Sequence, residues 1–141
     1  CQAIIVICYS YFVDTADKFK LEEFFAALAD RTRLRLLNLM RDGEVCVCFF
    51  AETLGTNNPK ISRHLAYLKR VNLVTARRDG KWMHYSLNRP TEPSAVKMFD
   101  SLLETLQADQ EMRADIANLS NVCCTPKFVS IASRSATAVE R

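Results

Sequence analysis

The sequence contains little glycine and proline, with three and four residues respectively among 141. Such low contents exclude a collagen-like repeat and a Gly/Pro-rich disordered chain. The six cysteines are too few for a disulfide scaffold, where cysteine usually exceeds about 8–10% of a short chain. With 49% hydrophobic and 25% charged residues, the composition is that of one ordinary globular domain. The cysteines therefore require a chemical explanation more than a structural one.

The apolar segment at residues 1–13 is shorter than the roughly 20 residues that a membrane-spanning helix needs. It also lacks the basic region of a secretory signal, so we predict no membrane partner and a cytoplasmic location, where thiols stay reduced. Residues 1–15 are interpreted as an arm that either packs on a partner subunit or reflects where the chain was cut. Cys1 and Cys8 in this arm are assigned no function.

Positive charge is concentrated in the middle of the chain. Residues 57–90 hold eight Lys/Arg and one Asp/Glu, whereas residues 1–56 and 91–121 are both net acidic. The total of +3 therefore hides a local charge of +7. A basic stretch of this kind is typical of a surface that meets nucleic acid phosphates, although a merely solvated basic face is the simpler alternative.

The hydrophobic periodicity predicts a mainly α fold with a small β-hairpin. Asp30 is the expected N-cap of an early helix, Asn58-Pro59 is expected to start another, and Asn72 is expected to end it with left-handed backbone. Asp79-Gly80 marks a hairpin within residues 74–87. One long helix is expected over residues 95–119, and with the first helix, near residues 21–28, it is expected to form a dimer interface.

This order of elements predicts a winged helix-turn-helix domain at residues 16–121 that binds duplex operator DNA as a homodimer. A tail at residues 122–141 follows it. Phosphate and base contacts need polar and basic side chains near the start of the recognition helix and on the wing. His64 could instead be a capping or core histidine. The predicted DNA contacts are Asn58, Lys60, Ser62, Arg63 and His64 on the helix, and Arg77, Arg78 and Lys81 on the hairpin.

Four motifs in this order resemble the ArsR family of winged-helix metalloregulatory repressors. They are LADRTRLRLLNLM at 28–40, EVCVC at 44–48, NPKISRHLAYLK at 58–69 and GKWMHYSL at 80–87. The resemblance extends from about residue 21 to residue 119. It implies a homodimeric repressor that leaves its operator when a toxic metal or metalloid binds.

Cys46 and Cys48 are the predicted inducer-binding pair. On a regular helix residues two apart point roughly 200° away from each other, whereas on an extended segment they lie on one side. They can therefore share an ion only if the helix that begins near Cys48 has an extended or distorted start. Thiolates select soft ions, and the resemblance indicates trivalent arsenic or antimony, with no organic cofactor.

In the arsenical-sensor motif that this sequence resembles, a third cysteine often follows the pair. Here the residues that follow the pair are Phe49, Phe50 and Ala51. A third sulfur ligand would have to come from Cys123 or Cys124, which otherwise are two inert thiols in a tail. These adjacent cysteines could also form a separate two-thiol site suited to a methylated arsenical. We predict Cys46 and Cys48 as primary ligands, with Cys123 or Cys124 contributing.

A redox sensor, a thiol enzyme and a structural dimer module with no DNA role are the alternatives to this prediction. A redox sensor would use the same thiols to form disulfides or persulfides. A zinc or cadmium site of the family's other kind needs histidine on the last helix, and residues 95–119 contain none. A thiol enzyme would need a glycine-rich or CxxC loop, which three scattered glycines do not provide, so we predict that the protein is not an enzyme.

Overall fold

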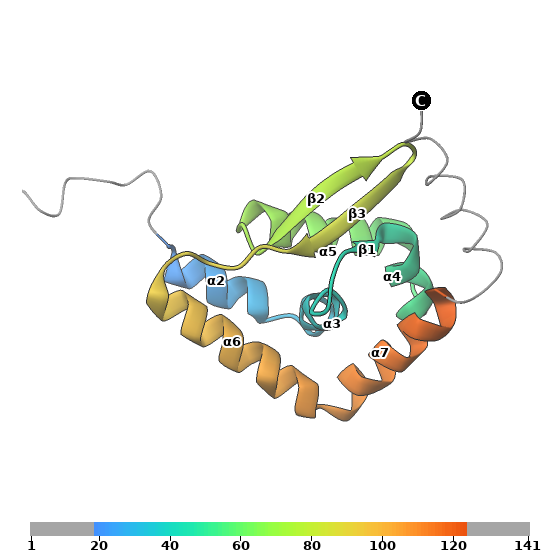
Figure 1. Ribbon diagram of the computed structural model, residues 1–141. Helices are drawn as coiled ribbons and strands as arrows, with labels where there is room; N and C mark the ends of the chain where they lie inside the picture. The colour runs from blue at the N-terminus through green and yellow to red at the C-terminus, as the bar shows by residue number, and fades with distance from the viewer. Residues whose placement is uncertain (1–18, 124–141) are drawn as a thin grey trace, which may run out of the picture.

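A computed structural model describes residues 19–123 of the chain (Figure 1). The predicted arm at residues 1–15 and most of the tail, including Cys124, lie outside the described residues. In chain order the elements are α2 (Leu21–Leu28), α3 (Arg31–Leu39), β1 (Val45–Cys46), α4 (Val47–Thr53), α5 (Asn58–Arg70), β2 (Val74–Asp79), β3 (Trp82–Leu87), α6 (Pro93–Ala108) and α7 (Gln110–Cys123). The expectation of a mainly α protein with a small β element is confirmed.

Local capping signals determine where the helices begin and end. The Asp30 carboxylate accepts a 2.9 Å hydrogen bond from the Arg33 amide, so the predicted cap of α3 is confirmed. The cap of α5 is Asn57, whose side chain accepts from the Lys60 amide at 2.9 Å. The prediction of Asn58 as this cap was wrong by one residue, because two adjacent asparagines offer the same capping chemistry. Asn72 ends the helix with a φ of 61°, as expected.

The sheet has three antiparallel strands in the order β1-β3-β2, one more than the hairpin that the sequence predicts. Strands β2 and β3 pair from Val74 with Leu87 to Asp79 with Trp82. Gly80, with a φ of 56°, allows the two-residue turn between them. The third strand, β1, pairs with the middle of β3 and is only two residues long, too short for a period-2 pattern to reveal. In Figure 1 the β2–β3 hairpin projects from the helical body as a wing.

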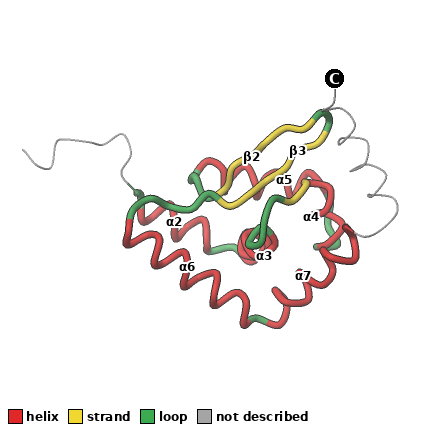
Figure 2. The backbone as a smooth tube through the Cα atoms, viewed as in Figure 1, coloured by secondary structure: helices red, strands yellow, loops and turns green. Residues whose placement is uncertain are grey.

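Helix α3 lies at the centre of the molecule, with α2 and α6 on one side and α4 and α7 on the other (Figures 1 and 2). Every element contributes to one apolar core around it. No helix among residues 19–123 is long and apolar enough to cross a membrane. The largest fully buried side chains include Phe50, Phe99, Leu36, Leu37, Met40, Ile61, Leu65 and Leu68.

The single long helix predicted over residues 95–119 was wrong, because the chain breaks at Asp109 into α6 and α7. Asp109 is extended, and its carboxylate accepts from the Met112 amide at 3.2 Å, so it ends one helix and caps the next. A continuous helix would need apolar residues at positions 109–110 and 113, where the sequence has polar ones. The apolar positions of the two halves are therefore out of phase, and the bend lets both halves face the core.

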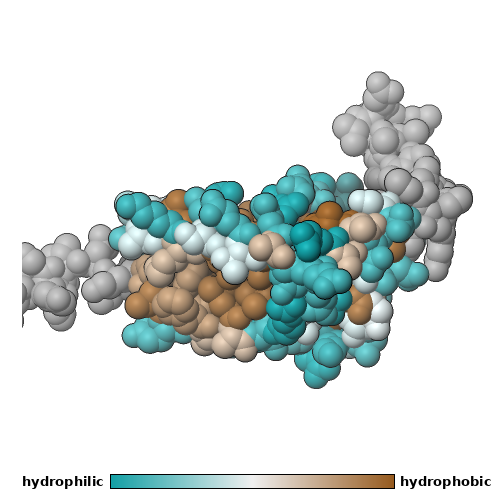
Figure 3. Space-filling view, turned by 90° about the horizontal axis from the view of Figure 1, so that it is seen from below, coloured by the Kyte–Doolittle hydropathy of each residue, from teal (hydrophilic) through white to brown (hydrophobic). Residues whose placement is uncertain are grey.

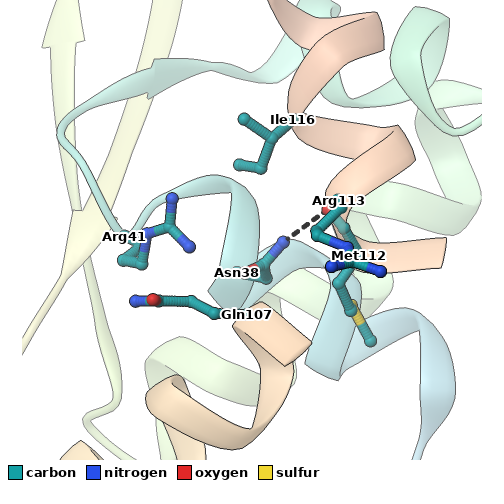
Figure 4. Close-up of a pocket in the computed structure, with 6 residues that line it drawn as sticks. All are labelled: Asn38, Arg41, Gln107, Met112, Arg113 and Ile116. Atoms are coloured by element: carbon teal, nitrogen blue, oxygen red, sulfur yellow. Dashed lines mark hydrogen bonds between the residues drawn. The ribbon is translucent and has the colours of Figure 1, made fainter. Parts of the chain in front are cut away.

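Helix α7 folds back onto α3, where polar contacts hold it. The Arg35 guanidinium donates two 2.7 Å hydrogen bonds to Asp115, whose side chain is only 3% exposed. Asn38 Nδ2, also buried, donates to the Met112 carbonyl at 2.9 Å, beside a cavity of about 100 Å³ between α3, α6 and α7 (Figure 4). No cysteine is among the residues that line this cavity, so it is separate from the predicted sulfur site.

We predict that Asp115→Ala lowers the free energy of unfolding by about 3 kcal/mol, because the partly buried Arg35 guanidinium loses both of its 2.7 Å hydrogen bonds and keeps only the more exposed Glu111, 3.3 Å away. Chemical denaturation of the reduced protein at fixed concentration measures the effect. The control is Asp100→Ala, which removes an exposed ion pair with Arg89 and should cost less than about 1 kcal/mol. Equal losses in the two variants would contradict this account of how α7 is held.

Candidate sulfur site and nucleic-acid interface

The sulfur atoms of Cys46 and Cys48 lie 3.1 Å apart. Cys46 is the last residue of β1 and also the N-cap of α4, with extended backbone at φ −70° and ψ 141°. Cys48 is the second residue of the helix. Because the chain changes from strand to helix between them, the two side chains meet instead of pointing to opposite sides. Cys46 is buried at 5% exposure and Cys48 is half-buried.

Burial, together with the hydrogen bond and the charge of the neighbouring Cys46 sulfur, raises the pKa of the Cys48 thiol to about 12. The Cys48 thiol is therefore protonated at neutral pH in the absence of a ligand. A bare cation that binds it must first displace its proton. Cys48 is thus a sheltered thiol next to a second sulfur atom rather than an exposed reactive thiolate.

Among residues 19–123, no group of three or more His, Cys, Asp or Glu side chains is arranged to hold a metal ion. A third ligand for the sulfur pair would therefore have to come from elsewhere or require rearrangement. Helix α7, which ends at Cys123, packs against α4, the helix that begins beside the pair (Figure 1). The side chain of Cys123 and all of Cys124 lie outside what the structure describes.

Helix α5 presents a polar face to the surface and an apolar face to the core. Ile61, Leu65 and Leu68 are fully buried. The predicted contact residues Asn58, Lys60, Ser62 and Arg63 are all exposed near the start of the helix. Within residues 19–123, neither Lys60 nor Arg63 forms an ion pair, so both cations are available to an external anion.

His64 differs from the other predicted contacts because its side chain is only 18% exposed. Its Nδ1 atom lies 3.5 Å from the carboxylate of Asp30, the residue that caps α3. This position favours the alternative of a histidine that ties α5 to α3. The other members of the predicted contact set on α5 remain on the open surface.

The three predicted wing cations have different surroundings. Lys81 is exposed in the turn, and Arg78 donates from Nε to the Gly80 carbonyl at 3.1 Å. Arg77 instead donates two hydrogen bonds to Glu44, from Nη2 at 2.6 Å and from Nε at 3.1 Å. The guanidinium of Arg77 lowers the pKa of the Glu44 carboxyl, which is therefore ionised at neutral pH. The middle of β2 is thus tied to the segment before β1.

An apolar surface lies over α2 and α6, away from the wing. Leu21 and Phe25 of α2 are 46% and 52% exposed, which is unusual for large apolar side chains. Figure 3, viewed from below, shows apolar side chains gathered over this side of the molecule. Contiguous apolar surface of this kind is typical of a protein–protein interface.

Comparison with known proteins places this geometry in a family. The family model described as "Bacterial regulatory protein, arsR family" matches residues 30–76. The arsenical resistance operon repressor of Escherichia coli K12 is 38% identical over 113 residues, which cover 79% of this chain and 94% of that protein. The chain belongs to the arsR family of bacterial regulatory proteins. The matched residues of this arsR family member run from the cap of α3 into β2 and include the sulfur pair and all of α5.

Two further similarities extend this assignment. The arsenic resistance transcriptional regulator ArsR2 of Pseudomonas putida KT2440 is 43% identical over 96 residues, covering 67% of this chain and 81% of that protein. The homodimeric winged helix-turn-helix domain of Mb0332 from Mycobacterium bovis superposes with a TM-score of 0.51 at 30% identity, covering 62% of this chain and 78% of that one. The relatives are regulators rather than enzymes, and the winged helix-turn-helix fold is confirmed.

Glu44 and His84 are polar members of the site that no sequence pattern singles out as contacts. Both owe their positions to the pairing of β1 with β3, which sets Cys46 opposite His84 and brings Glu44 to 3.4 Å from His84 Nδ1. No short-range pattern encodes this pairing. The only available hint was their presence within the motifs EVCVC and GKWMHYSL.

We predict that Cys46→Ala speeds the alkylation of Cys48 by iodoacetamide at pH 8. The substitution removes the neighbouring sulfur that helps to raise the Cys48 pKa, so more thiolate forms, while burial still keeps the rate below that of a free cysteine. Mass spectrometry of the peptide containing residue 48 measures the rate. Ser62→Ala, an exposed change on α5, is the control and should leave the rate unchanged. An unaltered rate in the Cys46 variant would contradict the interaction between the two thiols.

Proposed function

We propose that this arsR family member is a homodimeric transcriptional repressor that releases operator DNA when trivalent arsenic or antimony binds Cys46 and Cys48. The observation that carries the proposal is the 3.1 Å sulfur pair at the start of α4. This pair lies at the start of the helix that directly precedes the exposed, basic α5. The names of the relatives from E. coli and P. putida, both concerned with arsenic resistance, support the choice of inducer.

The protonated state of Cys48 favours arsenous acid over a divalent cation. Arsenous acid carries three hydroxyl groups, each of which can leave as water with one thiol proton when an arsenic–sulfur bond forms. Two thiols thus give a bis-thiolate arsenic hydroxide and two waters, and a third thiol displaces the last hydroxyl. A divalent cation must instead release the thiol protons to solvent, at a cost that grows as the pKa rises.

The proposed third ligand is Cys123 or Cys124. Helix α7, which ends at Cys123, packs against α4, the helix that begins at the sulfur pair. A site that uses only the adjacent tail cysteines would suit a methylated arsenical, which has two exchangeable positions. That version of the repressor is the alternative to an arsenite sensor based on Cys46 and Cys48.

Ligand binding would act on DNA through the connection between α4 and α5. Only residues 54–57 separate the two helices, and Asn57 caps α5. Joining Cys46 to Cys48 through arsenic would constrain the start of α4 and displace this helix against α5. The ligand then stabilises a conformation with lower DNA affinity, which is the coupling that an inducer needs.

The proposed DNA contacts are the exposed residues of α5 and the wing cations. A positively charged helix N-terminus with adjacent polar side chains fits the major groove, and the wing fits the neighbouring backbone or minor groove. Two such surfaces in a homodimer would match a two-fold symmetric operator. The exposed apolar side chains of α2, beside α6, are the proposed dimer surface, and the homodimeric Mb0332 domain supports it.

We predict that arsenite releases the reduced wild-type protein from operator DNA and that Cys46→Ser/Cys48→Ser abolishes this release. The double variant should still bind DNA, because neither sulfur lies on α5 or the wing. Fluorescence anisotropy with labelled operator measures release, and titration of free thiols reports how many are consumed.

The matched control is Cys123→Ser/Cys124→Ser, which should weaken the arsenite response without abolishing it. A normal arsenite response in the Cys46/Cys48 variant would contradict the assignment of these two cysteines as the primary ligands. Release by oxidant but not by arsenite would favour a redox repressor instead. Loss of response only in the tail variant would favour the two-thiol site for a methylated arsenical.

We predict that Lys60→Ala and Arg63→Ala each weaken binding to duplex DNA. Each substitution should also lower the slope of log affinity against log salt by about 1, because one fewer phosphate is neutralised by the protein. A salt series of anisotropy titrations measures the slope. Lys97→Ala removes an exposed charge from α6 and serves as the control. An equal effect of the control, or binding that does not depend on salt, would contradict an interface on α5.

A further inference from the structure

Glu44 joins the sulfur site to the wing. It lies two residues before Cys46, and its carboxylate accepts hydrogen bonds from both Nη2 and Nε of Arg77, 33 residues away. This bidentate pair occupies the Nε/Nη2 edge of the guanidinium, and the same edge would bind a phosphate or a guanine. Asp79 lies on the other side, 3.7 Å from Arg77 Nη1. Two carboxylates therefore surround a cation that was predicted to contact DNA.

The register of the sheet places the sulfur site and Arg77 in one cross-strand row. Cys46 is opposite His84, and His84 is opposite Arg77. Residues directly opposite each other in antiparallel strands share a face of the sheet. His84 is thus between the cysteine and the arginine, and its Nδ1 atom lies 3.4 Å from Glu44. A displacement of β1 at Cys46 would be transmitted directly to Glu44.

We propose that Glu44 is a positioning residue that competes with DNA for Arg77, and that ligation of Cys46 and Cys48 strengthens its hold. The second part rests on the proposed function, whereas the first does not. In the DNA complex Arg77 turns from Glu44 to a phosphate. With arsenic bound, the two sulfurs fix β1 against α4 and hold Glu44 where it retains Arg77.

The exposure of the pair makes this exchange feasible. The Arg77 and Glu44 side chains are 58% and 34% exposed, and ion pairs so open to water are weak. DNA phosphates can therefore replace the carboxylate without leaving a buried charge. A modest change in the position of Glu44 then alters DNA affinity by a measurable factor, since the competing interactions are of similar strength.

The test compares DNA affinity with and without arsenite for wild type and Glu44→Gln. The variant keeps the side-chain shape but loses the charge that holds Arg77. It should bind operator DNA about threefold more tightly without arsenite, with a slightly steeper salt dependence, since one more cation becomes available. The ratio of affinities without and with arsenite should fall by a similar factor, while the number of thiols consumed stays the same.

Asp79→Asn is the matched control, because this carboxylate also lies near Arg77 but belongs to the wing and not to the segment before β1. It should raise DNA affinity and leave the arsenite ratio unchanged. In an Arg77→Gln background, Glu44→Gln should have no effect on either quantity. This double variant separates competition for Arg77 from a general gain in positive charge.

Weaker DNA binding by Glu44→Gln would overturn the competition, because Glu44 would then be orienting Arg77 toward DNA. An unchanged arsenite ratio, in a protein whose wild type responds to arsenite, would overturn the link to the sulfur site. If the wild type does not respond at all, the proposed inducer is wrong. The titrations without arsenite still decide whether Glu44 and DNA compete for Arg77.

Discussion

The pairing of β1 with β3 is the constraint on which the candidate site depends. Val45 and Cys46 are held opposite Tyr85 and His84, so the chain enters α4 from an extended conformation. Without this pairing Cys46 would be free to continue the helix, and its sulfur would turn away from Cys48. The same two-residue strand places the Glu44 carboxylate where it accepts a hydrogen bond from Arg77 of the wing. This two-residue strand thus connects the two thiols with the charged side chains of the wing.

The helical frame gives this strand a rigid support. Helix α3 contributes buried leucines to the core and two arginines to ion pairs, Arg31 with Asp109 at the junction of α6 and α7 and Arg35 with Asp115 of α7. These contacts neutralise acidic charges of the C-terminal region within the molecule. The cations of residues 57–90, by contrast, are mostly left at the surface. The acidic residues of the C-terminal region thus form ion pairs that support the fold, whereas most cations of residues 57–90 lie exposed on the surface.

The wing is only partly an exposed basic element. Lys81 is exposed at the turn, but Arg77 is held between two carboxylates, and the net charge around it is negative when His84 is neutral. Charge counted along a sequence overstates what a ligand meets, because ion pairs between distant segments reduce it. The cations of this region that form no ion pair within residues 19–123 are therefore concentrated on α5 and the turn, whereas Arg77 is paired.

Features that depend on neighbouring residues could be predicted from the amino-acid sequence. The Asp30 cap, left-handed Asn72, the hairpin turn and the apolar face of α5 follow from capping chemistry, backbone sterics and helical period, which act over a few residues. The cysteine spacing likewise limited the pair to an extended or distorted helix start.

Features that join segments far apart in the chain are set by the tertiary structure alone. It turns His64 toward Asp30 and sets Glu44 against Arg77. Strand register and helix packing depend on which distant surfaces are available for burial, and no local pattern records them. The thiols and the basic helix could therefore be identified from the sequence, whereas only the fold revealed how the two are connected.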